Sequence, residues 1–200
     1  MNTPSHAILN LALLGRRSKP QLNSPIFWGA LVPDLAMFVF FVWGRFIVQM
    51  DNETMWGDFF FRPFWQDIFA VGNSIPLALL SIGIALGVRR RYPQRQAVVT
   101  VIIFIALSSI LHCLADLPLH ADDAHRHFWP LSNFRYNSPI SYWNPENHGQ
   151  IFVLVETLLV LVASWRVWQL LRSRWAKVLL IGSNIFMIIM GTAYYTQIGP

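Results

Sequence analysis

The chain has 200 residues, of which 54% are hydrophobic and 12% are charged, and its formal net charge is +5. Ordinary globular domains carry roughly a quarter charged residues, so this composition excludes a soluble domain with a fully polar surface. The single cysteine, Cys113, excludes an intramolecular disulfide.

The N-terminal residues predict a short helix that cannot cross a bilayer. Thr3 and Pro4 are typical of a helix start, with Thr3 as the N-cap and Pro4 at the first helical position. The apolar stretch that follows ends at Leu14 or Gly15. A helix of about ten residues has half the length that a membrane span requires.

A second helix is expected to start after Pro25 and to kink at Pro33. Together the two helices would form a hairpin whose connection, residues 16–19, is basic. At 1.5 Å per residue, His6 and Asp34 both lie roughly 15 Å from this connection, near the middle of the bilayer. A carboxylate at that depth normally faces a partner or a cavity, so Asp34 is a candidate functional residue.

Five apolar stretches are long enough, alone or with flanking residues, to cross a hydrocarbon core of ~30 Å. They cover residues 27–50, 68–88, 97–111, 151–171 and 178–190. The expected fold is therefore all-α: a polytopic membrane helical bundle of five spans plus the short N-terminal intramembrane helix. Residues 1–200 are expected to form one integral membrane domain.

Basic residues mark alternate connections between these spans. Residues 16–19, 89–95 and 172–177 hold ten of the fifteen Lys and Arg residues and no acid, whereas 51–67 and 116–148 hold eight of the ten acids. Basic loops stay in the cytoplasm, so the loop 116–148 is expected to be extracytoplasmic, in a bacterial inner membrane. The high pI follows from this topology, and no nucleic-acid partner is inferred.

Five of the six histidines lie between residues 109 and 149. His112 and Asp116 are one helical turn apart, and a proline then ends the helix before His120. Neutral His and ionised Asp are ligands for divalent ions, which predicts a metal site here. The predicted ligands are His112 and Asp116, with Asp34 as a third and His6 or His120 as a fourth. Zinc is the first candidate, with manganese or magnesium as alternatives, and the competing interpretation is a polar network without an ion.

Three charged residues near the outer face are candidates for catalysis. Glu156, one to two turns inside the fourth span, is the predicted general base. Arg126 and Arg135 are the nearest extracytoplasmic cations, and we expect them to stabilise a developing anion. His125 and His127 are interpreted instead as part of a solvated stretch, because charged residues surround them.

Two loops, 56–66 and 128–145, are rich in aromatic residues and proline. Aromatic side chains favour the membrane interface, so both loops are expected there. They can form a lid over an amphiphilic substrate, or an interfacial belt with no role in chemistry.

Three short motifs, Ser5-His6, Val32-Pro33-Asp34 and His112-x3-Asp116, together resemble the LexA-regulated, membrane-bound metal-dependent hydrolase family. The resemblance implies that a leading His, a Pro-Asp box and a His-x3-Asp box bind metal. The chain departs from the family where Leu35-Ala36 replaces the second acid of the box, and no His-Arg-Gly-x-x-His segment is present. The run from His112 to His120 is also similar to the ligand run of zinc-dependent phospholipase C and P1-type nucleases, one residue shorter.

Both resemblances imply hydrolysis of a phosphoester or similar bond. The resulting prediction is an integral-membrane, metal-dependent hydrolase that acts on a phosphoester or acyl bond of a membrane lipid or lipid-like substrate at the extracytoplasmic face. The alternative is a non-enzymatic membrane protein, such as a transporter, a metal-handling protein or an assembly factor, because transporters also place carboxylates at mid-bilayer. The oligomeric state is not predicted.

Overall fold

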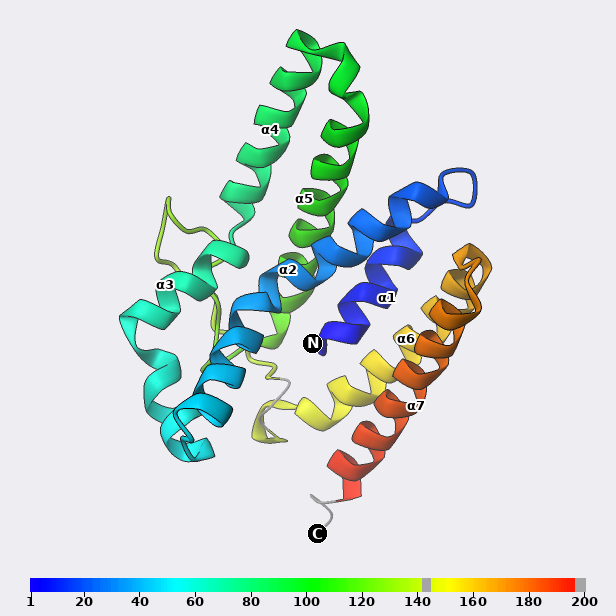
Figure 1. The fold of residues 1–200 in the computed structure, drawn as a ribbon. Helices are drawn as coiled ribbons and strands as arrows, with labels where there is room; N and C mark the ends of the chain where they lie inside the picture. The colour runs from blue at the N-terminus through cyan, green and yellow to red at the C-terminus, as the bar shows by residue number, and fades with distance from the viewer. Residues whose placement is uncertain (142–144, 197–200) are drawn as a thin grey trace.

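A computed structural model of the chain describes residues 1–141 and 145–196, and every regular element in this part is helical. The α-helices are α1 (Thr3–Leu14), α2 (Asn23–Val42), α3 (Pro63–Gly72), α4 (Ile75–Arg91), α5 (Gln96–Asp116), α6 (Gly149–Leu170) and α7 (Arg174–Thr196) (Figure 1). Short helical turns include η3 (Thr54–Asp58) and η4 (Phe59–Phe61), which lie between α2 and α3, and η6 (Leu117–Leu119), which extends α5. The predicted all-α fold is confirmed.

The helices are long and apolar enough for the predicted polytopic arrangement. Four segments qualify as membrane spans: Pro20–Ile47, Pro93–Leu119, Gly149–Leu170 and Arg174–Ala193. A fifth is obtained if α3 and α4, which meet at a bend of 42°, act as one span. The break lies inside the predicted stretch 68–88 because Ser74 caps α4, with its Oγ accepting a hydrogen bond from the Leu77 N–H at 3.1 Å.

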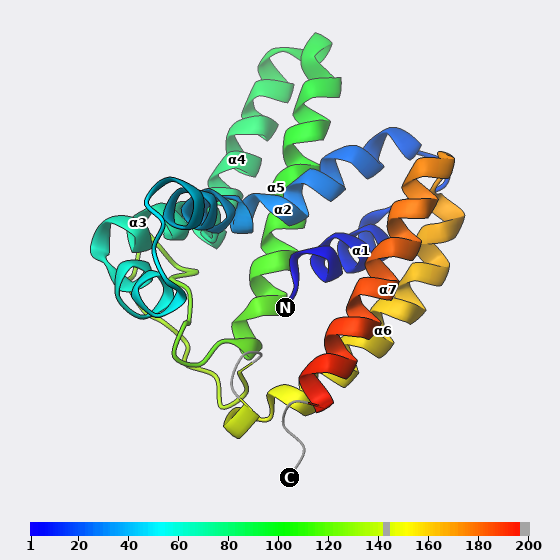
Figure 2. The ribbon, with the colours of Figure 1, turned by 60° about the horizontal axis from the view of Figure 1, so that its bottom comes forward.

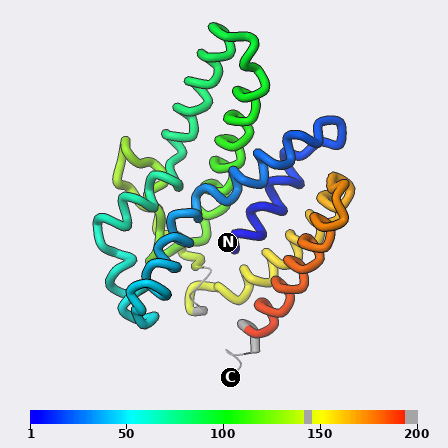
Figure 3. Tube along the Cα trace, viewed as in Figure 1, coloured from blue at the N-terminus to red at the C-terminus, as the bar shows by residue number. Residues whose placement is uncertain are grey.

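The α4–α5 hairpin and the α6–α7 hairpin lie on either side of α1 and α2 (Figures 1 and 2). The N-terminus lies near the centre of the molecule, beside α5 and α6 (Figure 3). The three basic connections, which join α1 to α2, α4 to α5 and α6 to α7, lie at one end in both ribbon views. Which end faces the cytoplasm stays a prediction from the charge distribution.

Two apolar clusters hold these helices together. One is built from Ile8, Leu11, Leu22, Ile26, Val160, Ala163, Val167 and Leu180, which join α1 and α2 to α6 and α7. The other joins α2 to α3 and the turns between them through Phe40, Met50, Met55, Phe60 and Phe69. Many other apolar side chains remain exposed on the outer helix faces, such as Trp165 at 76% and Leu179 at 71%, as a lipid-facing surface requires.

Close contact between α2 and α5 positions the candidate site. A Cβ atom on Gly29 would lie only 2.3 Å from the carbonyl oxygen of Ile105, so a side chain there is incompatible with this contact. The Gly29 carbonyl has no helical donor, because Pro33, four residues later, lacks an N–H. The hydroxyl of Ser109 in α5 donates to this carbonyl at 2.9 Å. The proline in α2 thus creates an acceptor that α5 satisfies, which fixes how the two helices align.

Candidate metal centre

One face of α5 carries a row of polar side chains that point to α2. Ser108 donates to the Ile26 carbonyl at 2.6 Å, and one turn later the fully buried His112 donates from Nδ1 to the Ala30 carbonyl at 2.7 Å. Because a carbonyl can only accept, Nδ1 carries a proton. Such a bond on the far nitrogen is what orients metal-binding histidines, and it directs Nε2 of His112 to the opposite side.

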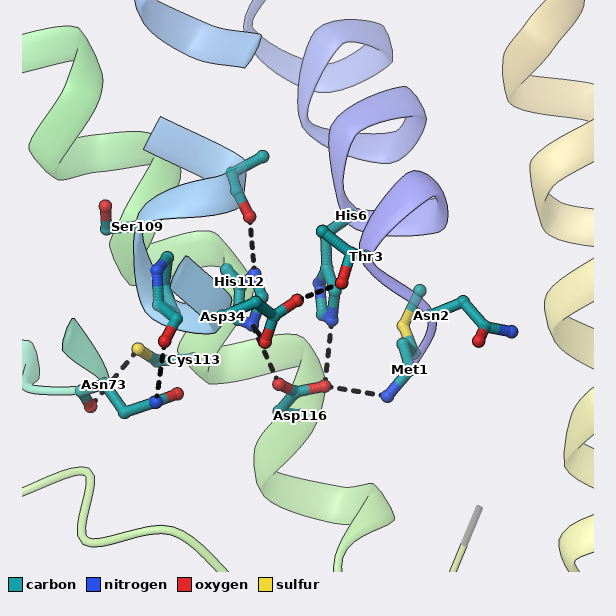
Figure 4. A network of polar contacts seen from close by, with 12 residues as sticks. Met1, Asn2, Thr3, His6, Asp34, Asn73, Ser109, His112, Cys113 and Asp116 are labelled. Carbon is teal, nitrogen blue, oxygen red and sulfur yellow. Dashed lines mark hydrogen bonds and ion pairs between the residues drawn. The ribbon is translucent and has the colours of Figure 1, made fainter. Parts of the chain in front are cut away.

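Nε2 of His112 faces two carboxylates (Figure 4). It lies 2.9 Å from Oδ2 of Asp116 and 3.4 Å from Oδ1 of Asp34, but it makes no hydrogen bond of acceptable geometry. A lone pair facing two anionic oxygens is repulsive unless a proton or a metal ion lies among them. Two donors bound to one tetrahedral zinc ion are roughly 3.3 Å apart, so the distance between His112 and Asp34 fits a shared metal.

Helix α1 brings His6 and Thr3 to the same place. Nε2 of His6 lies 2.9 Å from Oδ1 of Asp116, and its ring stacks on that of His112 with 3.6 Å between centroids. His6, His112 and Asp116 offer ligand atoms that all lie within 4.8 Å of one another. Thr3 is the first residue of α1 and not its N-cap, which is Asn2. The Thr3 hydroxyl instead donates to Oδ2 of Asp34 and so orients that carboxylate.

Asp116 also belongs to a second group, with His120 and His125, whose ligand atoms again lie within 4.8 Å of one another. Nε2 of His120 lies 3.6 Å from Oδ1 of Asp116, and its Nδ1 donates to Oδ2 of Asp123 at 2.7 Å. The described structure therefore brings all five predicted metal ligands into one buried cluster that can hold a metal ion. It adds Asp123 and His125, which the sequence did not predict as site residues.

His125 and His127 are buried, with 6% and 4% of their surface exposed, so their interpretation as a solvated stretch is wrong. Burial, and then the charge of His120, lowers the pKa of His125 to about 3 and keeps this imidazole neutral. Burial also opposes charge on His120, but its contacts with Asp116 and Asp123 raise its pKa to about 9. The sequence did contain a pattern that could have predicted this burial. His125 and His127 are two residues apart, so in an extended chain their side chains lie on the same face, opposite that of Arg126.

A cavity of about 820 Å³ lies against Asp116, which both His/Asp groups share, and against His120 and His125 of the second group, whereas His6 and His112 do not line it. Its polar wall includes Asp34, Asp116, His120, Asp122, Asp123 and His125. Its apolar wall is formed by Met37, Phe38, Phe41, Trp56, Phe60 and Phe61. The first aromatic loop, 56–66, therefore contributes to the cavity wall. The loop 128–145 contributes Ser141, whereas Tyr142 and Trp143 lie outside the described residues.

The three predicted catalytic residues do not line this cavity. Oε1 of Glu156 accepts a hydrogen bond from the backbone N–H of Asn2 at 2.9 Å. Arg126 forms an ion pair with Asp67 at 2.5 Å, and Arg135 donates to Gln66 at 2.8 Å. Their catalytic roles stay predictions.

A further cation lies beside the cluster, because the α-ammonium group of Met1 is 2.8 Å from Oδ1 of Asp116. No known protein family, curated protein or solved structure matches the chain. The resemblance to membrane-bound hydrolases therefore stays an expectation, and function is inferred from the site itself.

Proposed function

We propose that the chain is an integral-membrane, metal-dependent hydrolase that acts on a phosphoester or acyl bond of a lipid-like substrate. The observation that carries this proposal is the orientation of Nε2 of His112, which is buried and faces the carboxylates of Asp34 and Asp116. Both carboxylates lie on the wall of a large cavity. With His6, these residues supply two imidazoles and two carboxylates. Such a ligand set suits zinc first, and manganese or magnesium as alternatives.

A divalent ion in this cluster would act as a Lewis acid that activates water or polarises the scissile group. The residues of the chain provide the geometry for it. The Ala30 carbonyl holds His112, the Thr3 hydroxyl holds Asp34, and the burial of both side chains strengthens their electrostatic interactions. Asp122 has an exposed side chain and lines the cavity, so we propose it in place of Glu156 as the general base.

The nature of the cavity supports a lipid-like substrate. Pockets for amphiphilic molecules combine an apolar wall with a few convergent polar groups, and here the aromatic wall from α2, η3 and η4 adjoins the His/Asp cluster. The proposed side is extracytoplasmic, because the three basic connections lie at the opposite end of the helices from η3 and η4. Arg126 and Arg135 would then interact with an anionic headgroup at this face.

Hydrolysis of a panel of phospholipids, prenyl phosphates and acyl esters by the purified protein tests the proposal. We expect turnover that is lost when a chelator removes the metal and that falls at least ~100-fold in Asp116→Asn, a typical effect of disrupting a metal site. The matched control is Asp58→Asn, because Asp58 is an exposed acid paired with Arg62 on the surface. Equal activity in both variants would refute the proposal. Stoichiometric metal without turnover on any lipid would instead favour a transporter or metal-handling protein.

A further inference from the structure

We propose that Asp116 bridges two divalent ions, the second of which is held by His120 and His125. The two groups of ligand atoms share only Asp116, and each group is compact enough to surround one ion. This inference rests on the metal-binding part of the proposed function and does not depend on hydrolysis. It adds a second metal site to the single ion considered above.

The two oxygens of Asp116 face different partners. Oδ2 lies 2.9 Å from Nε2 of His112, on the side of Asp34. Oδ1 lies 3.6 Å from Nε2 of His120, and it also lies 2.9 Å from Nε2 of His6 and 2.8 Å from the α-ammonium group of Met1. A carboxylate that binds one ion through each oxygen holds the two ions close together, and two-metal sites have ions roughly 3.5–4 Å apart.

The orientation of His120 matches that of His112. Nδ1 of His120 donates to Oδ2 of Asp123, and Nδ1 of His112 donates to the Ala30 carbonyl. In both residues Nε2 therefore faces Asp116. The distance of 3.6 Å between His120 and Asp116 is longer than an ordinary hydrogen bond. It is close to the ~3.3 Å that separates two donors on one tetrahedral ion.

His125 is a buried imidazole that the protein itself leaves without a polar partner. Within the described part of the chain it makes ring contacts only, at 5.0 Å from the centroid of His120 and 5.8 Å from that of His127. Because His125 lines the cavity and forms one compact group with Asp116 and His120, its imidazole can bind an ion there. His127 beside it has a buried Nε2 without a partner, while its Nδ1 donates to the Asn73 carbonyl.

A second ion also narrows the substrate class. Paired metal ions stabilise both the attacking and the leaving oxygen during displacement at phosphorus. Asp34, Asp116, His120 and His125, which belong to the two proposed metal sites, line the cavity, so the site favours the phosphoester of a lipid over an acyl ester.

Metal stoichiometry of the full chain tests the second site. The purified protein is loaded with excess Zn²⁺, desalted and analysed for zinc per chain, and a Mn²⁺-loaded sample is examined by electron paramagnetic resonance. We expect two ions per chain and a spin-coupled manganese spectrum in the wild type. His125→Gln and His120→Gln should retain one ion and show an uncoupled spectrum. His148→Gln is the matched control and should retain two, because His148 lies outside the cavity and is exposed.

A wild-type protein that saturates at one zinc ion, or a folded His125→Gln protein that still binds two, would overturn the inference. The wild-type stoichiometry and spectrum decide the question even if a variant does not fold. One ion together with lipid hydrolysis would refute the second site and leave the proposed function intact. Absence of any bound ion would refute both.

Discussion

Replacement of Gly29 by Ala tests whether the contact between α2 and α5 assembles the site. The new Cβ would lie 2.3 Å from the Ile105 carbonyl oxygen and 2.8 Å from Cβ of Ser108. Relief of this overlap requires the helices to separate by about 1 Å, because ordinary carbon–oxygen contacts begin near 3.4 Å. The same movement would lengthen the hydrogen bond from His112 to Ala30, which is 2.7 Å long in the structure.

Two effects on stability oppose each other in this variant. Overpacking costs about 1–3 kcal/mol, whereas alanine in place of glycine in a helix contributes up to ~1 kcal/mol. The expected loss of unfolding free energy is therefore about 0–2 kcal/mol, small enough for the protein to fold. Metal affinity should fall by about 10–100-fold, the usual result of losing the hydrogen bond that orients a ligand.

The assay is zinc affinity by competition with a chelator, together with thermal unfolding in detergent. Gly83→Ala in α4 is the control, because no atom lies within 4 Å of a Cβ at that position. This control should bind zinc as the wild type does and be equally or slightly more stable. A Gly29→Ala protein with wild-type zinc affinity would refute the conclusion that the α2–α5 contact positions His112.

Three more outcomes follow from individual contacts. Ser109→Ala leaves the Gly29 carbonyl unpaired, so chemical denaturation should show a loss of about 1–3 kcal/mol; no loss would mean another donor replaces it. Trp56→Ala, on the apolar wall, should raise KM for a lipid several-fold with kcat nearly unchanged, because this side chain contributes to substrate binding and not to the chemical step. A fall in kcat alone would contradict that role. His125 stays neutral when folded, with its pKa lowered to about 3. In metal-free protein His125 should therefore contribute a loss of about 1.4 kcal/mol per pH unit below pH 6.5. The loss of stability between pH 7 and pH 5, measured by thermal unfolding, should be smaller in His125→Gln than in the wild type, and an equal loss would contradict a buried neutral His125.

Much of the site could be predicted from short-range pattern. His112 and Asp116 share a helix face because they are four residues apart, and the basic hairpin tip placed His6 and Asp34 at a common depth. At 1.5 Å per residue, His112 lies ~25 Å from the basic connection at residues 89–95, whereas His6 and Asp34 lie roughly 15 Å from theirs, so parallel helices would place these two residues about 10 Å deeper than His112. The structure closes that gap because α2 crosses α5 diagonally (Figure 1), an inclination that the sequence pattern of neither helix specifies.

The apolar helices, the polar face of α5 and the residue types able to bind metal could all be predicted, since they depend on composition and helical period. Which of these residues meet depends on how the helices pack. His6 and Asp116 are 110 positions apart, and their contact depends on α1 packing between α2 and α6. Tertiary contacts also bury His125 and pair Arg126 with Asp67 of α3. Long-range contacts of this kind arise from the complementary shapes of packed helices, which local periodicity does not encode.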